Sequence, residues 1–231
     1  MTDRDSQLSI EPIEVLASPG SPYSRKMLAL LRYRRIAYRA IWGTHRHPPV
    51  GYPEPKVKLL PTVYCRGASG ALEALVDSTP IAKKFEQDYP ARSATPDDPA
   101  LAFYNDLIED YADEWLTKPM FHYRWYHEVD RINAGPLLSH WGNITRPSAE
   151  AEQFATEVTR QQFERLYVVG SNDTTAQTIE NSFERVVEIL DRLLGVKGYV
   201  LGSRPATADF ALYGQLSQLG VVEPTPAAIL G

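Results

Sequence analysis

The strongest constraint on the fold is a change of sequence pattern about ninety residues into the chain. Before it, short β-branched runs alternate with helical segments; after it, helical periodicity continues with almost no strand signal. Segment 91–99 between them is rich in Pro, Asp, Ser and Ala, as is typical of an interdomain linker. We therefore predict a loose leader over 1–12, an α/β domain over 13–90 and an all-helical domain over 100–231.

The first half is predicted to begin β-α-β. Ile13–Ala17 alternates and is β-branched, which indicates a strand. Apolar residues at helical spacing predict a helix from about Tyr23 to Arg35, and a second strand is expected over 37–42. Five prolines between His45 and Pro61 argue against a regular helix there and favour an irregular loop.

The same half is predicted to close with a hairpin and a helix. Strands are expected over 61–65 and 71–76, joined by a Gly-containing turn, and a helix from Asp77 and Ser78 to about Tyr89. In the second half, apolar periodicity predicts four helical segments. They cover 101–128 with a break near Pro119, then 149–169, 175–194 and 206–220.

Composition argues against several functions. The net charge of -5 gives no general field for nucleic acid or anionic lipid. The single cysteine, Cys65, cannot form an internal disulfide, a C-x-x-C pair or a thiolate zinc site. The polar N-terminus has no apolar signal segment, and no apolar run approaches the ~18 residues that span a bilayer. We therefore expect a soluble cytoplasmic protein that binds neither nucleic acid nor membrane.

Two predicted helices begin directly after strands and carry hydroxyls at their starts. These are Ser21 on the first helix and Ser78, behind Asp77, on the second. A helix N-terminus favours anions because its first N–H groups are unpaired and its dipole is positive there. A hydroxyl that donates to a bound thiolate would lower the pKa of that thiol. Both serines are equally suited to plain N-capping, so spacing alone leaves the two interpretations open.

Other features carry weaker signals. A strand-opening proline such as Pro61 is often a turn device and in some proteins follows a cis peptide bond. The aromatic stretch Met120–His127 either lines a pocket or packs in the helical core, and Cys65 is interpreted as core packing. His122 and His127 are five positions apart and do not share a helix face well, so we predict no metal site.

Taken in order, these motifs resemble the cytosolic glutathione transferase superfamily. Ser18–Lys26 resembles the strand-to-helix segment of its serine-type, bacterial-like members, and Leu60–Val63 is similar to its Val-Pro segment, where the proline is cis. Asp77–Ile81 resembles its Glu/Asp-Ser-x-x-Ile element, and Tyr199–Tyr213 the buried helix of its second domain. The resemblance implies a thioredoxin-like N-terminal domain (βαβ-ββα) and an all-α helical-bundle C-terminal domain.

The resemblance also implies which residue faces the thiol of glutathione. Ser21 lies where serine-type enzymes carry the hydroxyl that stabilises the thiolate, and it is the expected catalytic residue. Ser18, Tyr23 and Ser24 compete with it. No cysteine stands near Ser21, whereas the cysteine-bearing classes reduce thiols through a mixed disulfide.

The remaining matching residues are implied to hold the rest of the tripeptide. Leu60, before Pro61, would bond the cysteinyl part through its main chain. Asp77 and Ser78 would hold the γ-glutamyl group, with the carboxylate taking its ammonium and the hydroxyl its carboxylate. Lys58 is a candidate for the glycyl carboxylate.

We therefore expect an enzyme that uses glutathione as co-substrate and no metal, and that acts as a homodimer. A stabilised thiolate would attack a small, apolar electrophile held by proximity, or support a related addition, isomerisation or peroxide reduction. The alternative is a non-catalytic module of the same fold for ligand carriage or protein assembly.

One position departs from the family pattern. Ala206 stands where the buried C-terminal helix usually begins with Ser or Thr, and Thr207 is displaced by one. The hydroxyl cap is missing or shifted, at a typical cost of ~1 kcal/mol. Asp209 can still favour the helix start electrostatically.

Overall fold

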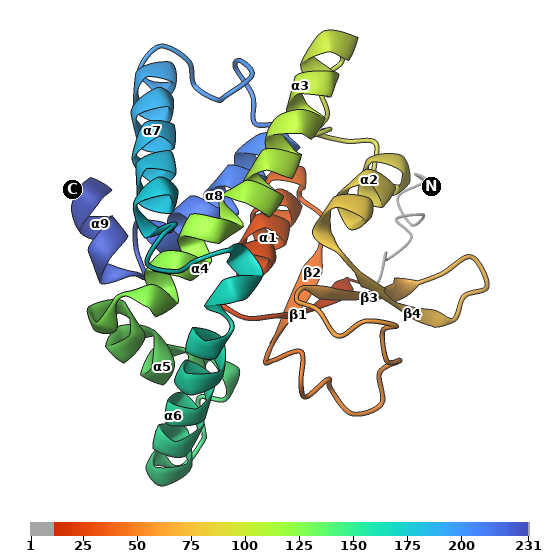
Figure 1. Cartoon of the computed structure of the whole chain (residues 1–231). Helices are drawn as coiled ribbons and strands as arrows, with labels where there is room; N and C mark the ends of the chain where they lie inside the picture. Colours follow the sequence, from red (N-terminus) through yellow and green to blue (C-terminus); the bar gives the residue numbers. More distant parts are fainter. Residues whose placement is uncertain (1–11, 231) are drawn as a thin grey trace, which may run out of the picture.

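The computed structural model describes residues 12–230, so the expected leader lies almost wholly outside it. The N-terminal half forms a four-stranded mixed sheet in the order β2-β1-β3-β4 (Figure 1). Strand β1 (Ile13–Ala17) pairs in parallel with β2 (Tyr38–Trp42) and antiparallel with β3 (Thr62–Arg66), which pairs antiparallel with β4 (Leu72–Val76). This is the thioredoxin-like arrangement that the sequence predicts.

Helices α1 (Pro22–Arg34) and α2 (Ser78–Asp88) pack on the sheet through one shared core. The alternation along the strands sends Val15 and Val63 to this core, and the two residues are paired across β1 and β3. The fully or almost fully buried members from the helices are Met27, Leu30, Leu31, Ile81, Ala82 and Phe85. Burial of such side chains contributes about 1.5–3 kcal/mol each and fixes both helix starts relative to the sheet.

The proline-rich loop contains neither helix nor strand over residues 43–61, as expected. It packs through Tyr52, whose ring lies 4.7 Å from that of Tyr64 and whose hydroxyl donates to Glu14 Oε2 at 2.6 Å. Glu14 and Tyr64 face each other in the β1–β3 register, on the opposite side of the sheet from Val15. The loop therefore covers the sheet face that the helices leave free.

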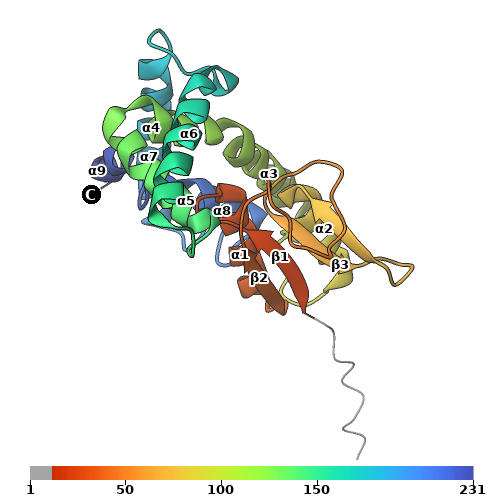
Figure 2. The ribbon, with the colours of Figure 1, turned by 90° about the horizontal axis from the view of Figure 1, so that it is seen from below.

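The second half is helical throughout (Figures 1 and 2). Its elements are α3 (Pro99–Asp110), the π-helical turn η1 (Tyr111–Trp115), α4 (Thr117–Tyr126), α5 (Glu128–Gly142), α6 (Ser148–Glu164), the 3₁₀ turn η2 (Leu166–Val169), α7 (Ala176–Leu194), α8 (Thr207–Leu219) and α9 (Pro224–Leu230). None of the helices within residues 12–230 is long and apolar enough to cross a lipid bilayer. The domain limits proposed from the sequence stay a prediction.

Two features of this half differ from the sequence-based expectation. The first long segment changes its hydrogen bonding at Tyr111–Trp115, where a π-helical turn forms, rather than at Pro119. Pro119 lies in the first turn of α4, where its missing N–H costs no intrahelical hydrogen bond. Helix α5 was not predicted, because Gly135 and Pro136 interrupt its pattern. Its packing explains the glycine: a Cβ at Gly135 would stand 2.4 Å from Thr159 Oγ1 of α6.

Helix α8 joins the two halves by packing along α1 (Figure 2). Gly214 permits a close approach, since a Cβ there would stand 2.5 Å from the carbonyl oxygen of Pro22 at the start of α1. The α8 start has no hydroxyl cap of its own, as predicted. Asp209 accepts from Ala206 N at 2.9 Å, and Asn105 of α3 accepts from Ala208 N at 3.0 Å, so a distant side chain replaces the cap.

Candidate functional site

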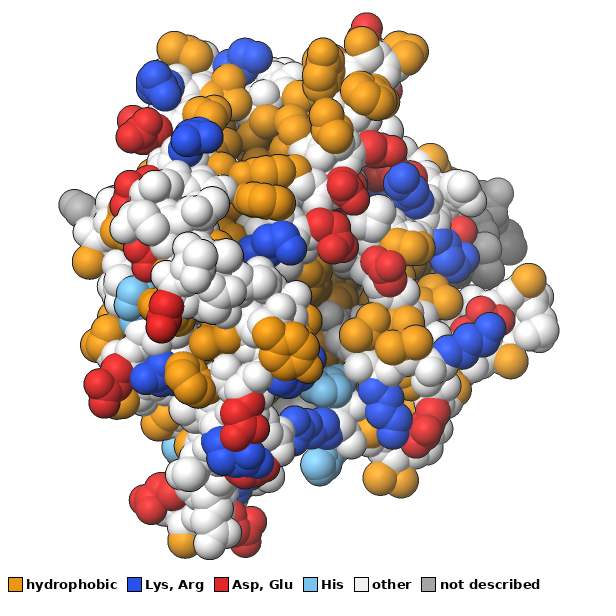
Figure 3. Space-filling model, viewed as in Figure 1, with side chains coloured by type: hydrophobic (Ala, Val, Ile, Leu, Met, Phe, Trp, Pro, Cys, Tyr) orange, Lys and Arg blue, Asp and Glu red, His pale blue; other side chains and the backbone are white. Residues whose placement is uncertain are grey.

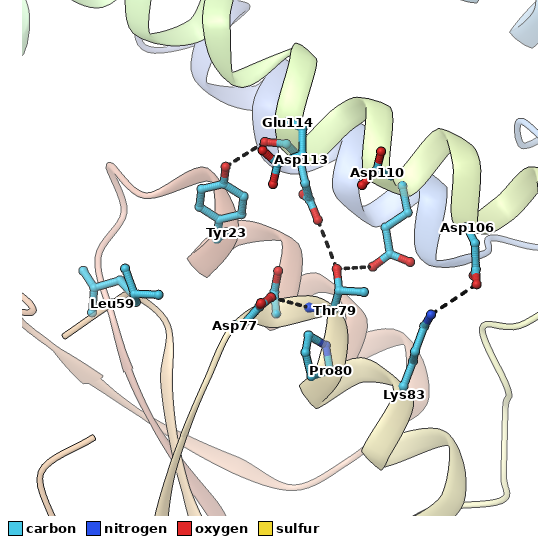
Figure 4. Close-up of a pocket in the computed structure, with 13 residues that line it drawn as sticks. Tyr23, Leu59, Asp77, Thr79, Pro80, Lys83, Asp106, Asp110, Asp113 and Glu114 are labelled. Atoms are coloured by element: carbon cyan, nitrogen blue, oxygen red, sulfur yellow. Dashed lines mark hydrogen bonds and ion pairs between the residues drawn. The ribbon is translucent and has the colours of Figure 1, made fainter. Parts of the chain in front are cut away.

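A pocket of about 670 Å³ lies between the sheet half and the α3–η1 segment (Figure 4). Its walls come from the β2–β3 loop, the start of α2, the first turn of α1, α3 and η1. The lining residues are Tyr23, Leu59, Leu60, Asp77, Ser78, Thr79, Pro80, Lys83, Asp106, Glu109, Asp110, Asp113 and Glu114. Three of the predicted binding residues, Leu60, Asp77 and Ser78, therefore meet in one cavity.

The strand side of the pocket is formed by Leu59 and Leu60. The peptide bond between Leu60 and Pro61 is cis, in agreement with the resemblance. The Thr62 hydroxyl donates to the carbonyl oxygen of Leu59 at 2.8 Å, which fixes the chain just before β3. Leu59 and Leu60 thus line the cavity from the chain before β3, and Asp77 and Ser78 line it from the start of α2.

The start of α2 forms the polar floor of the pocket. Asp77 is exposed, adopts φ 74° and accepts from Thr79 N at 3.2 Å, as an N-cap. A positive φ in a residue other than glycine is uncommon and costs energy, and it occurs often at functional sites. Ser78 is buried directly behind it. This corner combines an exposed carboxylate, of which Oδ1 caps the helix, with a helix N-terminus, so it can bind an ammonium and a carboxylate side by side.

The start of α1 supplies a hydroxyl cap rather than an acid. Ser21 Oγ accepts from Ser24 N at 3.2 Å, which leaves its own hydrogen available for donation. Ser21 is half-buried and lies next to the pocket in sequence without lining it. The Ser24 hydroxyl is buried and accepts from Ser18 N at 3.2 Å. Ser18 is also almost fully buried.

Tyr23 does line the pocket, but its hydrogen is already used. Its hydroxyl donates to the backbone carbonyl oxygen of Asp113 at 2.8 Å. Burial, above all other effects, raises the pKa of Tyr23, so the phenol stays protonated. Tyr23 therefore joins α1 to the π-helical turn and presents its ring, rather than a free donor, to the cavity.

A charge cluster that sequence reasoning missed forms part of the pocket wall, where Thr79, Glu109 and Asp113 line the cavity. Lys26 Nζ of α1 is within 2.7 Å of Glu109 Oε1, 2.5 Å of Asp113 Oδ2 and 3.1 Å of Thr79 Oγ1. Thr207 of α8 donates to the second oxygen of Glu109 at 2.7 Å. Burial raises the pKa of Asp113, and the Lys26 charge opposes that shift. The cluster joins α1, α2, α3, η1 and α8 at the site.

The sequence did contain a signal for this cluster. Pro22, Lys26 and Leu30 follow one another at i, i+4 spacing and are all buried, so Lys26 falls on the packed side of α1. Glu109 and Asp113 are also four apart. A lysine on an apolar helix face calls for a buried acidic partner, because an unpaired charge is costly to bury.

Some predicted residues lie outside the pocket. Lys58 is about half exposed and lies 3.7 Å from Glu54 as an exposed ion pair. In the aromatic stretch, Tyr123 and Trp125 are buried in the helical core, which favours the packing interpretation. Cys65 packs against the sheet core, and burial raises the pKa of its thiol. A raised pKa keeps that thiol protonated and weakly reactive.

Comparison with known proteins agrees with this architecture. Residues 16–93 match the family model of the glutathione S-transferase N-terminal domain. No curated protein sequence matches the chain significantly. The sheet, the pocket at its edge and the helical half together define a thioredoxin-like protein with an added helical bundle. By this match, residues 16–93 are similar to the glutathione S-transferase N-terminal domain, and the fold of the chain is that of solved glutathione transferases.

Solved structures share the fold at low sequence identity. The beta-etherase LigF from Sphingobium sp. strain SYK-6 aligns with a TM-score of 0.65 at 14% identity, covering 95% of this chain and 88% of its own. A glutathione transferase family member from Pseudomonas fluorescens pf-5, solved with two glutathione bound, gives 0.56 at 14% identity and covers 97% and 84%. One from Pseudomonas putida, with glutathione disulfide bound, gives 0.55 at 13% and covers 95% and 80%.

Proposed function

We propose that the chain binds glutathione in this pocket and stabilises its thiolate for attack on a small, apolar electrophile. The observation that carries the proposal is the meeting of Leu60 with Asp77 and Ser78 in one cavity. Those groups are the hydrogen-bonding complement of a γ-glutamyl-cysteinyl unit. The glutathione-bound relatives from Pseudomonas species support the choice of ligand.

In this proposal the α2 corner holds the zwitterionic γ-glutamyl end. The Ser78 hydroxyl and the helix N-terminus take the carboxylate, while the Asp77 carboxylate takes the ammonium. The Leu60 main chain bonds the cysteinyl part across the cavity. Lys58 stays a candidate for the glycyl carboxylate, because it lies on the β2–β3 loop that also carries Leu60. To bind the ligand it would give up only an exposed ion pair with Glu54, and such pairs contribute little to stability.

The thiol is proposed to lie at the start of α1, next to Ser21. Of the four hydroxyls considered there, the Tyr23 hydrogen is taken by Asp113, and Ser18 and Ser24 are buried against each other. Ser21 can accept from the backbone and still donate. That donation, with the positive end of the helix dipole, stabilises the thiolate form and lowers the thiol pKa. The Tyr23 ring and Leu59 offer apolar surface for the electrophile.

Calorimetry with glutathione, followed by an assay with a chloronitrobenzene, tests the proposal. We expect binding in the micromolar to millimolar range and turnover that depends on Ser21. Absence of binding at millimolar glutathione would overturn the proposal. Binding without turnover, unchanged in a Ser21→Ala variant, would favour the non-catalytic module instead.

A homodimer is proposed alongside the activity. Large apolar side chains stand exposed on α3 and η1, including Phe103, Leu107 and Trp115. Trp115 also lines an apolar hollow beside α7, so this face of the molecule presents a broad apolar surface (Figure 3). A second copy of the chain would cover this surface. Light scattering during size-exclusion chromatography tests this, and a Phe103→Glu variant is expected to shift the mass toward one chain.

A further inference from the structure

A cluster of two histidines and one glutamate lies in the helical half, away from the glutathione pocket. Its members are His122 in α4, His127 at the α4–α5 junction and Glu180 in α7. Sequence reasoning separated the two histidines because it placed both on one helix. The structure ends α4 at Tyr126, and His127 is extended at φ -79°, ψ 138°, so its ring turns back toward His122. That expectation of separated rings was wrong.

The three ligand atoms already have the spacing of a metal site. His122 Nε2 lies 3.2 Å and His127 Nε2 lies 3.0 Å from Glu180 Oε1, and all three atoms are within 4.8 Å of one another. Tetrahedral zinc with bonds of about 2.0–2.1 Å separates its ligand atoms by about 3.4 Å. The two distances from histidine nitrogen to Glu180 Oε1 therefore fit almost unchanged. The distance between the two histidine nitrogens needs only a side-chain adjustment by the half-exposed His127.

The residues around His122 orient its ring as hydrogen-bond partners do around metal-ligating histidines. His122 is fully buried, and its Nδ1 lies 2.8 Å from the Ser171 hydroxyl, also buried. That hydroxyl can donate to Nδ1 or accept from it. When it accepts from Nδ1–H, it holds the tautomer in which Nε2 is unprotonated and its lone pair faces the cluster.

Stacking fixes the planes of both rings. His122 stacks on Tyr126 with centroids 4.6 Å apart, and His127 stacks on Tyr123 at 5.6 Å. The Tyr126 hydroxyl donates to Asp173 at 2.9 Å, which anchors the first pair. Preorganised rings lose little freedom when an ion binds, which raises affinity.

We propose that His122, His127 and Glu180 bind one divalent transition-metal ion, with zinc as the best fit. Two imidazoles and one carboxylate are a known zinc ligand set, and solvent reaches the exposed side to complete the coordination. The site would join α4, the α5 start and α7, and so stabilise the helical half. None of the three residues lines the glutathione pocket, so the proposal is independent of the proposed function.

Zinc titration of tag-free protein, stripped with a chelator and kept free of glutathione, tests the site. We expect calorimetry to give one zinc per chain, and Co²⁺ to give the visible absorption of a tetrahedral site. At zinc concentrations 100 times Kd, Tm should rise by roughly 5–10 °C. Absence of stoichiometric binding would overturn the proposal.

Three variants separate this site from other zinc contacts. His127→Asn and Glu180→Gln, both at partly exposed positions, should weaken binding at least 10-fold and abolish the zinc-dependent rise in Tm. His140→Asn removes an exposed histidine of α5 and should bind like the parent chain. Equal affinity in all three variants would overturn the assignment. Comparison of each variant with and without zinc removes any effect of the substitution on folding alone.

Discussion

The starts of α1 and α2 face the same region but have opposite chemistry. Helix α2 begins with an exposed carboxylate at positive φ and a buried serine, and both line the pocket. Helix α1 begins with a neutral hydroxyl cap and Pro22, with no acid in its first turn. A helix start without an acidic residue attracts an anion, because the positive end of the helix dipole is not neutralised there. A helix start with a carboxylate beside it can bind both charges of a zwitterion. The difference supports the thiolate at α1 and the γ-glutamyl group at α2.

Lys26 connects the two helix starts, so its removal should have the largest effect. Lys26→Met would leave Glu109 and Asp113 buried without a cation. We expect a loss of about 3–5 kcal/mol in the free energy of unfolding, measured in urea. Lys83→Met breaks an exposed pair with Asp106 at 3.2 Å and should cost less than about 1 kcal/mol. Similar losses in both variants would show that burial of the cluster has no energetic importance.

Ser21→Ala tests the α1 side of the comparison. Loss of a donor to the thiolate should lower kcat about 10²–10³-fold with little change in glutathione affinity. The N-cap is lost as well, at about 1 kcal/mol of stability. Ser24→Ala, which removes a buried hydroxyl of the same turn, is the control and should keep the thiol pKa of bound glutathione unchanged. A Ser21→Ala enzyme with the parent thiol pKa would contradict the assignment.

Asp77→Asn tests the α2 side and should have a smaller effect. Asparagine caps helices as well as aspartate and tolerates positive φ, so the fold should be retained. Loss of the charge opposite the ammonium should raise the Kd for glutathione about 10-fold or more, with kcat nearly unchanged. Asp98→Asn, at the N-cap of α3 outside the pocket, is the matched control. The proposed γ-glutamyl orientation is wrong if both variants bind glutathione alike.

The α8 start offers the smallest prediction. From the sequence alone, Ala206→Ser would restore a hydroxyl cap worth ~1 kcal/mol. In the structure Asn105 already accepts from Ala208 N, and the Ala206 N–H is bonded to Asp209. We therefore expect a gain below about 0.5 kcal/mol. Asn105→Ala should instead destabilise by about 1–3 kcal/mol, because a buried N–H loses its acceptor; urea unfolding measures both.

Local chemistry allowed most of the first half to be predicted. Strand alternation, the helix start at Ser21, the glycine turn and the proline before β3 each act over a few residues, and each appears where expected. The predicted binding residues Leu60, Asp77 and Ser78 meet in the pocket. Helix α5 was missed because packing of Gly135 against α6, rather than its own periodicity, determines it.

The sequence by itself determined the order of strands and helices in the first half, the character of the helix starts there and the similarity of residues 16–93 to the glutathione S-transferase N-terminal domain, because these depend on neighbours along the chain. Only the tertiary structure decided that Lys26 is a buried link, that Asn105 caps α8 and that His122 and His127 share Glu180. Each of those contacts joins groups more than 50 residues apart, so their energies depend on burial and orientation that no local pattern contains.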